Sequence, residues 1–430
     1  MSYLLCGSKP YQNINFIKLI DNNFDNIIRF NMNVPNCDSI YGNINSTVQV
    51  LNTHVLEHYI QKADLNKWLK DYHMLDKQQI INFFNYINNN SISIKFIGCS
   101  IKCNNNKDKI NLLLKKILSN NLFTNGKIPR CGLGFIADIY DKKIVPFLIG
   151  YGIYEEDSDK SYYLQANKIG DCHNATLEKK ILIDFHNNNI VDATLSCIED
   201  KILPTLNCKY IKPKIQSVIY ILKTYGICIL KNYYSQEILD NLIKEYHKIF
   251  EEQQSKIEVL DKEECSNDER IFHAQKYSEH IKQYFSDDKL FNSIAVEYTK
   301  HKLNKKTLIN KVVYEEGKIK NSGAGWHRDN HDCQFKVLMY LSDVNEKNGP
   351  FQFITNSSKK YVGYPPPRTK SYNTRFHDKT IEDLIEKNVN CNLHDVIGEK
   401  GTIAIVDTTY IHRGKIIEQG ERYAITEYFI

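Results

Sequence analysis

The sequence predicts two domains in series: an α/β domain with a parallel sheet, then a β-rich domain of sandwich or jelly-roll type with flanking helices. From residue 3 to about 202, short apolar runs alternate with longer amphipathic ones, the pattern of strands joined by crossover helices. Residues 203–214 carry two prolines and no periodicity. After about residue 308, short apolar runs are separated by turn residues. We therefore place the domains at 1–205 and 206–430.

The N-terminal elements follow from apolar periodicity. Strands are expected at YLLC, NIIRFNM and SIKFIGCS, and amphipathic helices at 67–87 and 109–120. The first strand runs into a small-residue turn, which is where a Rossmann-like parallel sheet binds nucleotides. A GxGxxG motif is absent from this turn, so the sequence does not predict a dinucleotide site.

The C-terminal elements begin with a helix, a strand and a second helix over about 215–250. Gly226 marks the first break, and the SQE sequence at 235–237 marks the start of the second helix. The short β runs that follow include QFKVLMYLSD, GPFQFIT, GTIAIVD and RYAITEYFI. Such closely spaced runs predict a sandwich or jelly roll.

Composition narrows the classes of function. The chain has 430 residues, of which 42% are hydrophobic and 25% charged, as in an ordinary globular protein. The net charge of +5 comes from scattered lysines, so nucleic acid is not the expected partner. Twelve cysteines form no CxxC pair, and the N-terminus does not resemble a signal peptide, which favours a cytoplasmic location. No apolar run is long enough to predict a membrane span.

Metal-ligand residues gather in GWHRDNHD at 325–332. Residues two apart in a strand face the same side, so His327, Asp329 and His331 are all candidates. Non-haem Fe(II) oxygenases use two histidines and one carboxylate on one face of the iron. The distal His412, at the end of an apolar run, can supply a further ligand, and Arg422 opens the final strand. An arginine there can bind a dicarboxylate through two parallel hydrogen bonds.

These motifs resemble the phytanoyl-CoA dioxygenase family of Fe(II)/2-oxoglutarate oxygenases over about residues 215–430. WHRD is similar to the family's Trp-His-x-Asp, and GTIAIVDTTYIHRG to its distal histidine strand. The resemblance implies a double-stranded β-helix that uses Fe(II) and 2-oxoglutarate to hydroxylate a substrate. It implies His327, Asp329 and His412 as iron ligands and Arg422 on the far carboxylate of 2-oxoglutarate. His331 is then expected near the ligands or exposed.

The stretch at 342–360 resembles the family's "Asn-Gly-Pro, then apolar strand, then Gly-Ser-His". Here the chain departs from the pattern, because it has Asn356-Ser357-Ser358 in place of Gly-Ser-His. The contacts that this loop makes to substrate or co-substrate are therefore not carried over.

A second resemblance covers about residues 3–200 and points to the sialyltransferases. LLCGSKP is similar to the start of their long nucleotide-binding motif, PRCG at 129–132 to their short motif, and the pair of tyrosines at 162–163 to their aromatic motif. His173, five residues before Glu178, resembles their last motif. The resemblance implies a CMP-sugar donor, with His173 as the general base that deprotonates an acceptor hydroxyl. It implies these donor-binding residues: Gly7, Ser8, Arg29, Asn31, Asn52, Cys131, Gly132 and Glu178.

Departures in this half leave the identity of the donor open. Ser8 stands where the family has asparagine, Arg130-Cys131 where it has Ser-Thr, and Ser161 where it has a histidine.

The two resemblances together predict a bifunctional enzyme, an oxygenase fused to a sialyltransferase-like glycosyltransferase, acting on one glycan or sugar derivative. An alternative is an active oxygenase whose degenerate N-terminal domain only binds a nucleotide or glycan. A further alternative is a non-enzymatic scaffold that retains the motifs of its folds.

Overall fold

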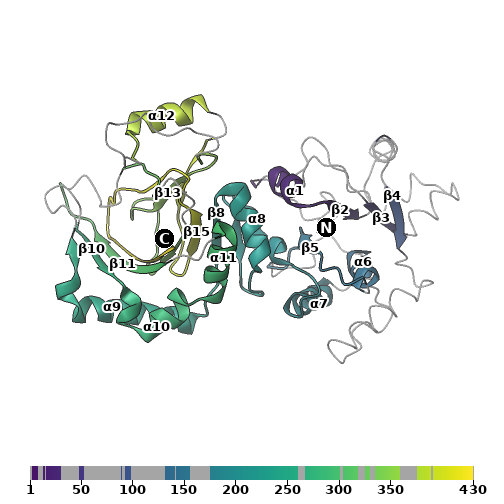
Figure 1. Cartoon of the computed structure of the whole chain (residues 1–430), viewed down its shortest axis with the longest axis horizontal. Helices are drawn as coiled ribbons and strands as arrows, with labels where there is room; N and C mark the ends of the chain where they lie inside the picture. The colour runs from purple at the N-terminus through teal and green to yellow at the C-terminus, as the bar shows by residue number, and fades with distance from the viewer. Residues whose placement is uncertain are drawn as a thin grey trace. The chain divides into compact units, whose positions relative to one another are not determined.

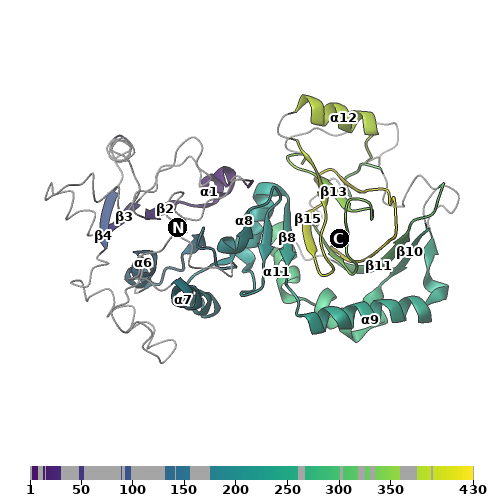
Figure 2. The same cartoon turned by 180° about the vertical axis from the view of Figure 1, so that it is seen from behind.

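The computed structural model describes residues 2–7, 13–14, 16–30, 48–52, 89, 93–97, 131–140, 142–154, 175–259, 267–300, 304–317, 325–329, 335–358, 375–388 and 391–429. The chain forms two compact units (Figures 1 and 2). Unit 1 is Met1–Ile202 with Tyr210–Pro213, and unit 2 is Leu203–Lys209 with Lys214–Ile430. The boundary predicted at 205 falls within the stretch that divides between the units.

Unit 1 contains a five-stranded sheet in the order β4-β3-β2-β1-β5, whose neighbouring strands are parallel. Strand β1, which has a neighbour on each side, is apolar and largely buried, as a strand covered on both faces must be. The winding between the strands runs largely through residues outside the described ranges, so a Rossmann-like topology stays a prediction. The strands are β1 (Tyr3–Cys6), β2 (Asn26–Phe30), β3 (Val48–Asn52), β4 (Ser93–Ile97), β5 (Phe147–Ile149) and β6 (Ile198–Glu199); the helices are α1 (Ile17–Asn23), α6 (Cys131–Tyr140), α7 (Ala175–Asn187) and the turn η2 (Thr194–Cys197).

Unit 2 is built on two sheets. The large sheet includes, in spatial order, β7 (Thr205–Asn207), β8 (Ile227–Lys231), β15 (Ile403–Asp407), β12 (Phe335–Tyr340), β17 (Glu421–Phe429), β11 (Lys305–Val313), β10 (Asn267–Phe272) and β9 (Glu258–Val259). The small sheet has the order β14 (Leu393–Val396), β13 (Phe351–Ile354), β16 (His412–Gly414). From β12 onward the chain passes back and forth between the sheets, with β13 and β14 in succession in the small sheet, which is the jelly-roll arrangement that the β runs predict.

The two sheets of unit 2 pack face to face through an apolar core. Phe351 and Phe353 of the small sheet lie in one cluster with Tyr340, Val406 and Ala424 of the large sheet. The face of the large sheet that carries these residues is called the inner face below. Because side chains alternate along a strand, the registers of the paired strands show which other residues share it.

Helices cover the outer face of the large sheet (Figures 1 and 2). Ser235 caps α9, as the SQE sequence predicts, and the Tyr246 hydroxyl of this helix donates to the Asn310 carbonyl at 3.0 Å. Gly226 ends α8 in the left-handed conformation, φ +76°, where an added Cβ would meet the Tyr410 ring. The helices are α8 (Ile215–Tyr225), α9 (Gln236–Glu252), α10 (Glu279–Ile281), α11 (Lys289–Thr299) and α12 (Asp378–Lys387), with the shorter turns η3 (Gln254–Lys256), η4 (Ala274–Lys276) and η5 (Lys282–Ser286).

Candidate metal centre

The two histidines predicted from WHRD and YIHRG lie opposite each other in an antiparallel bridge. The His327 N–H donates to the His412 carbonyl at 3.0 Å, and the His412 N–H donates to the His327 carbonyl at the same distance. Residues that exchange both backbone hydrogen bonds project their side chains to the same side. The two imidazole rings accordingly lie with their centroids 4.5 Å apart.

The predicted carboxylate completes a group of three ligand atoms. Asp329 Oδ1 lies 3.5 Å from the Nε2 atom of His327 and 3.5 Å from that of His412. The three ligand atoms all lie within 4.8 Å of one another. Ligand atoms that each sit about 2.1 Å from one ion are separated by roughly 3 to 4 Å, so the spacing suits a single metal ion.

The hydrogen bonds behind the rings fix which nitrogen faces the centre. Nδ1 of His327 contacts the Gly325 carbonyl at 2.8 Å, and Nδ1 of His412 contacts the Tyr410 carbonyl at 2.9 Å. A carbonyl oxygen only accepts hydrogen bonds, so each Nδ1 carries a proton, and Nε2 is the nitrogen of each ring that faces Asp329. This use of the second ring nitrogen is typical of histidines that bind metals.

Three potential ligand atoms therefore converge on one point. Burial lowers the pKa of His412 to about 4, so its ring is neutral near pH 7. Its Nε2 is buried and makes no hydrogen bond to the described residues. Such a lone pair, placed opposite a carboxylate, needs a cation to be satisfied. The residues present thus fit a divalent metal ion.

Sequence reasoning missed the residue that orients the carboxylate, Lys336 of β12. Its Nζ lies 2.7 Å from Asp329 Oδ2 and 4.7 Å from the centre of the Tyr428 ring, and its side chain is only 9% exposed. Burial alone would raise the pKa of Asp329, but the Lys336 ammonium and the two histidines hold it well below its usual value. Lys336 engages one carboxylate oxygen and leaves the other toward the histidines. The available signal was a lone lysine within the apolar run QFKVLMYL.

At 356–358, where the family has Gly-Ser-His, the backbone includes a residue in the left-handed region. Asn356 has φ +55°, in the left-handed region, where asparagine is the commonest substitute for the family's glycine. Ser357 is fully buried; its hydroxyl donates to the Ile354 carbonyl at 2.6 Å and accepts from the Ile411 N–H at 2.8 Å. Ser357 thereby fixes the backbone immediately before the distal histidine.

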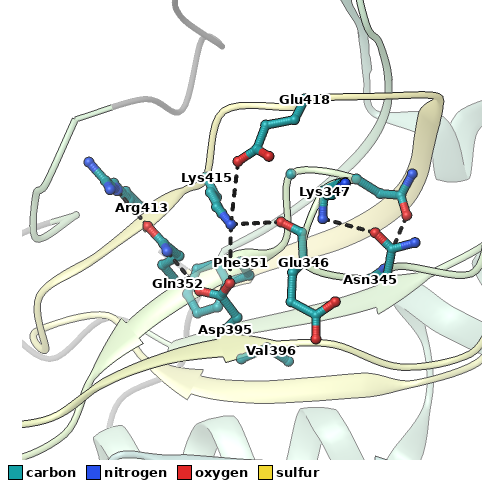
Figure 3. A network of polar contacts seen from close by, with 12 residues as sticks. Asn345, Glu346, Lys347, Phe351, Gln352, Asp395, Val396, Arg413, Lys415 and Glu418 are labelled. Carbon is teal, nitrogen blue, oxygen red and sulfur yellow. Dashed lines mark hydrogen bonds and ion pairs between the residues drawn. The ribbon is translucent and has the colours of Figure 1, made fainter.

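A polar network on the outer side of the small sheet holds β16 in place (Figure 3). Arg413 Nε donates to Gln352 Oε1 at 2.6 Å, and Gln352 Nε2 donates to Asp395 Oδ1 at 2.7 Å, so that one chain of contacts crosses β16, β13 and β14. Lys415 extends this chain through an ion pair with Asp395 at 3.5 Å. Because Arg413 directly follows the distal histidine, the network restricts the position of that histidine.

The remaining residues of WHRD have packing roles. Trp326 is buried in an apolar cluster with Ile354 and Ile411, and the Arg413 guanidinium lies 4.2 Å from the centre of its ring. Arg328 is buried on the side opposite the ligands, where its Nη2 donates to the Ser357 carbonyl at 2.9 Å. The tryptophan of the motif is therefore a core residue that supports the strand.

Arg422 lies at the start of β17 on the inner face. Its Nη1 donates to the Gly349 carbonyl, and its Nε is buried without a hydrogen bond to the described residues. Gly349 has φ +67°, and a Cβ there would meet the Lys415 carbonyl, so the Asn-Gly-Pro turn requires glycine. Burial raises the pKa of Tyr340 to about 12, although the positive charge of Arg422 acts to lower this pKa.

Tyr340 and Phe351 connect Arg422 to the histidines. The Phe351 N–H donates to the Tyr340 hydroxyl at 2.9 Å, and the Phe351 ring lies 5.3 Å from the His412 ring. Arg422 and the three-residue group thus border the same part of the inner core.

The N-terminal predictions are described only in part. Gly7, after β1, donates its N–H to the Ile149 carbonyl at 2.7 Å, and a Cβ there would meet the Gly150 carbonyl. A Cβ on Gly132 would meet the Tyr151 hydroxyl at 2.8 Å. Gly7 is therefore needed where the backbone approaches Gly150, at the carboxyl ends of β1 and β5, whereas the neighbour of Gly132 is the end of the Tyr151 side chain.

The other predicted donor residues are not brought into one group by the described part of unit 1. Arg29 of β2 is buried, with 2% of its surface exposed, and Glu178 is buried in the first turn of α7. Asn52 ends β3 and Cys131 begins α6. His173, Ser8 and Asn31, together with His331 of the C-terminal motif, lie outside the described residues.

No described helix is both long and apolar enough to span a membrane. Cys6, Cys197, Cys208, Cys228 and Cys391 are buried.

Comparison with known proteins concerns unit 2. Residues 222–415 match the family model for phytanoyl-CoA dioxygenase. Among solved structures, the chain is similar to the epimerase SnoN in complex with Fe3+, alpha ketoglutarate and nogalamycin RO, with 11% identity over 50% of this chain and 83% of that chain and a TM-score of 0.41. EctD from S. alaskensis with 2-oxoglutarate and 5-hydroxyectoine has 16% identity over 48% of this chain and 73% of that chain, with a TM-score of 0.37. A Pseudomonas putida prolyl-4-hydroxylase has 14% identity over 50% of this chain and 98% of that chain, with a TM-score of 0.35. No curated protein matches the chain.

Proposed function

We propose that unit 2 is an Fe(II)/2-oxoglutarate-dependent oxygenase that hydroxylates a small molecule or glycan. The observation that carries this proposal is the convergence of two imidazole Nε2 atoms and one carboxylate oxygen, all within 4.8 Å of one another. Two histidines and one carboxylate are the ligand set of non-haem Fe(II) oxygenases, and the family match over 222–415 supports the same choice.

Each residue of the site has a defined part in this function. His327, His412 and Asp329 would hold Fe(II), with Lys336 keeping the second carboxylate oxygen of Asp329 engaged. Arg422 would bind the far carboxylate of 2-oxoglutarate, since its buried Nε is available for an acceptor. When bound, Fe(II) leaves positions open for 2-oxoglutarate and oxygen, and oxidative decarboxylation of 2-oxoglutarate supplies the oxidising power for hydroxylation.

The experiment is conversion of 2-oxoglutarate to succinate by purified protein with Fe(II) and ascorbate. We expect slow conversion without substrate, and loss of conversion in His412→Ala. His280→Ala is the matched control, because this histidine lies on α10 and stacks on Tyr284 away from the inner face. Absence of both succinate formation and Fe(II) binding in the unsubstituted protein would refute the proposal.

The glycosyltransferase activity of unit 1 stays a prediction. Two of its motif glycines, Gly7 and Gly132, meet residues 150–151 at the edge of a parallel sheet where nucleotides commonly bind. The test is release of CMP from CMP-sialic acid in the presence of an acceptor. Release that is lost in His173→Ala supports the bifunctional enzyme, whereas binding of CMP without release supports the degenerate domain.

A further inference from the structure

A row of three side chains leads away from the metal centre along the inner face of the large sheet. Lys336 of β12 is paired with Tyr428 of β17, and Tyr428 is paired with Lys306 of β11. Lys336 is also paired with Val406, which belongs to the core between the sheets. Because directly paired residues share a face, all three side chains lie on the inner face.

The contacts of the row agree with its register. Lys336 reaches Asp329 at one end and lies over the Tyr428 ring. At the other end, the Lys306 ammonium lies 3.7 Å from the centre of the Phe272 ring, on the neighbouring strand β10. Tyr428, Lys306 and Phe272 are all only half-buried, so solutes can reach this part of the inner face.

One of the two lysines in the row has no carboxylate partner among the described residues. Lys336 is paired with Asp329, and Arg270 of β10 is paired with Asp268 at 3.1 Å. Lys306 makes no ion pair with any residue in the described ranges; its contact is with an aromatic ring. One positive charge thus remains beside two aromatic side chains, on the same face as the metal ligands.

We propose that Lys306 binds an anionic group of the substrate, a carboxylate or a phosphate, while Tyr428 and Phe272 contact the adjoining part of the molecule. This assignment rests on the proposed function, because the metal centre defines which end of the substrate reacts. Two inter-strand spacings separate Lys306 from Lys336, which places the anion about 10 Å from the carboxylate ligand. The substrate class is therefore an organic anion whose charged group lies about 10 Å from the carbon that is oxidised.

The first test measures anion binding without metal. Phenyl phosphate and benzoate are titrated separately into the full chain by calorimetry, since both combine an anion with a ring suited to Tyr428 and Phe272. Lys306→Met should weaken the binding of at least one probe about ten-fold or more. Lys306→Arg should restore it, which separates loss of charge from loss of folding. If only phenyl phosphate binds, the anion is assigned as a phosphate. If only benzoate binds, it is assigned as a carboxylate.

Lys311→Met is the matched control for this titration. Lys311 is on the same strand and is also half-buried, but it is paired with Tyr423, whose ring packs against Tyr246 of the outer-face helix α9. Removing its charge should leave binding unchanged. If Lys306→Met and Lys311→Met both bind as the unsubstituted protein does, or if neither probe binds at all, the proposal is wrong.

The second test locates the anion relative to the metal. In protein loaded with Mn(II), the phosphorus of bound phenyl phosphate, or the carboxylate carbon of bound benzoate, should show paramagnetic relaxation that corresponds to about 10 Å. A probe that binds with no such relaxation overturns the proposed position but leaves the oxygenase intact. If Mn(II) itself fails to bind, the proposed function fails, and the metal-free titration still decides whether Lys306 binds anions.

Discussion

Replacement of Lys336 by methionine tests the electrostatic design of the metal centre. Methionine approximates the length of lysine without its charge, so the variant leaves the Asp329 carboxylate buried with no ammonium 2.7 Å away. Breaking a buried ion pair by removing one partner costs about 3–5 kcal/mol. Because 15% of the Asp329 side chain is exposed, we take the lower end, about 3 kcal/mol. In a unit of this size the melting temperature should fall by about 6–12 °C.

Binding of a metal ion should offset the stability that is lost in Lys336→Met. The ion would lie about 5 Å from the Lys336 ammonium, and two such charges repel by several kcal/mol at the effective dielectric constant of a protein. Removing the ammonium therefore strengthens the attraction between Asp329 and the metal. We expect Co(II) to raise the melting temperature of Lys336→Met more than that of the unsubstituted protein.

Thermal unfolding with and without Co(II), followed by circular dichroism, provides the measurement. Lys311→Met, which removes a half-buried lysine from the other face of the large sheet, is the control and should melt close to the unsubstituted protein. The reasoning is refuted if metal-free Lys336→Met melts within about 2 °C of the control, or if Co(II) stabilises it less than the unsubstituted protein.

Three further predictions concern the supports of the site and the core. Ser357→Ala leaves the buried Ile411 N–H without an acceptor, so the free energy of unfolding in urea should fall by about 1–3 kcal/mol; no change would mean that the hydroxyl does not hold this strand. Asn356→Ala should cost about 1–2 kcal/mol because of its positive φ, whereas Asn356→Gly should cost almost nothing, and equal effects in urea titrations would contradict the left-handed conformation. Burial raises the pKa of Glu427 from 4.5 to about 7, so its contribution to stability is present below pH 4.5 and is lost as the pH rises through 7. The free energy of unfolding of Glu427→Gln, relative to that of the unsubstituted protein, should therefore rise by about 3 kcal/mol from pH 4 to pH 8. If the unfolding free energies of the two proteins changed in parallel with pH, this account of the burial of Glu427 would be wrong.

Part of the proposed ligand set could be predicted from a local pattern in the sequence. His327 and Asp329 are two apart in a strand, so their side chains are expected on the same side. His412 ends an apolar run and offers the same kind of ligand atom, which makes it a candidate as well. Their meeting depends on the bridge between His327 and His412, which is a long-range pairing. The resemblance to a known family, and not the spacing, supplied that pairing in advance.

The supporting residues could not be predicted in the same way. Lys336 reaches Asp329 because β12 pairs with β15, and the Asp329 N–H donates to the Thr408 carbonyl just after β15. Ser357 reaches Ile411 because β13 pairs with β16. Nothing in the letters around 336 or 357 specifies those partners. The jelly roll itself was predictable from the short β runs, whereas the fold of unit 1 depends on connections outside the described residues.

The most direct test of the metal centre is anaerobic titration of Fe(II), then 2-oxoglutarate, followed by the visible absorption that arises when a keto acid binds to Fe(II). We expect one Fe(II) per chain and a new absorption band with 2-oxoglutarate. Both should be lost in Asp329→Ala and in His412→Ala, while Arg422→Met should keep Fe(II) but bind 2-oxoglutarate weakly. His331→Ala should retain the iron and the band. An Asp329→Ala protein that binds Fe(II) and 2-oxoglutarate as the unsubstituted protein does, or a His331→Ala protein that loses iron, would contradict the proposed ligand set.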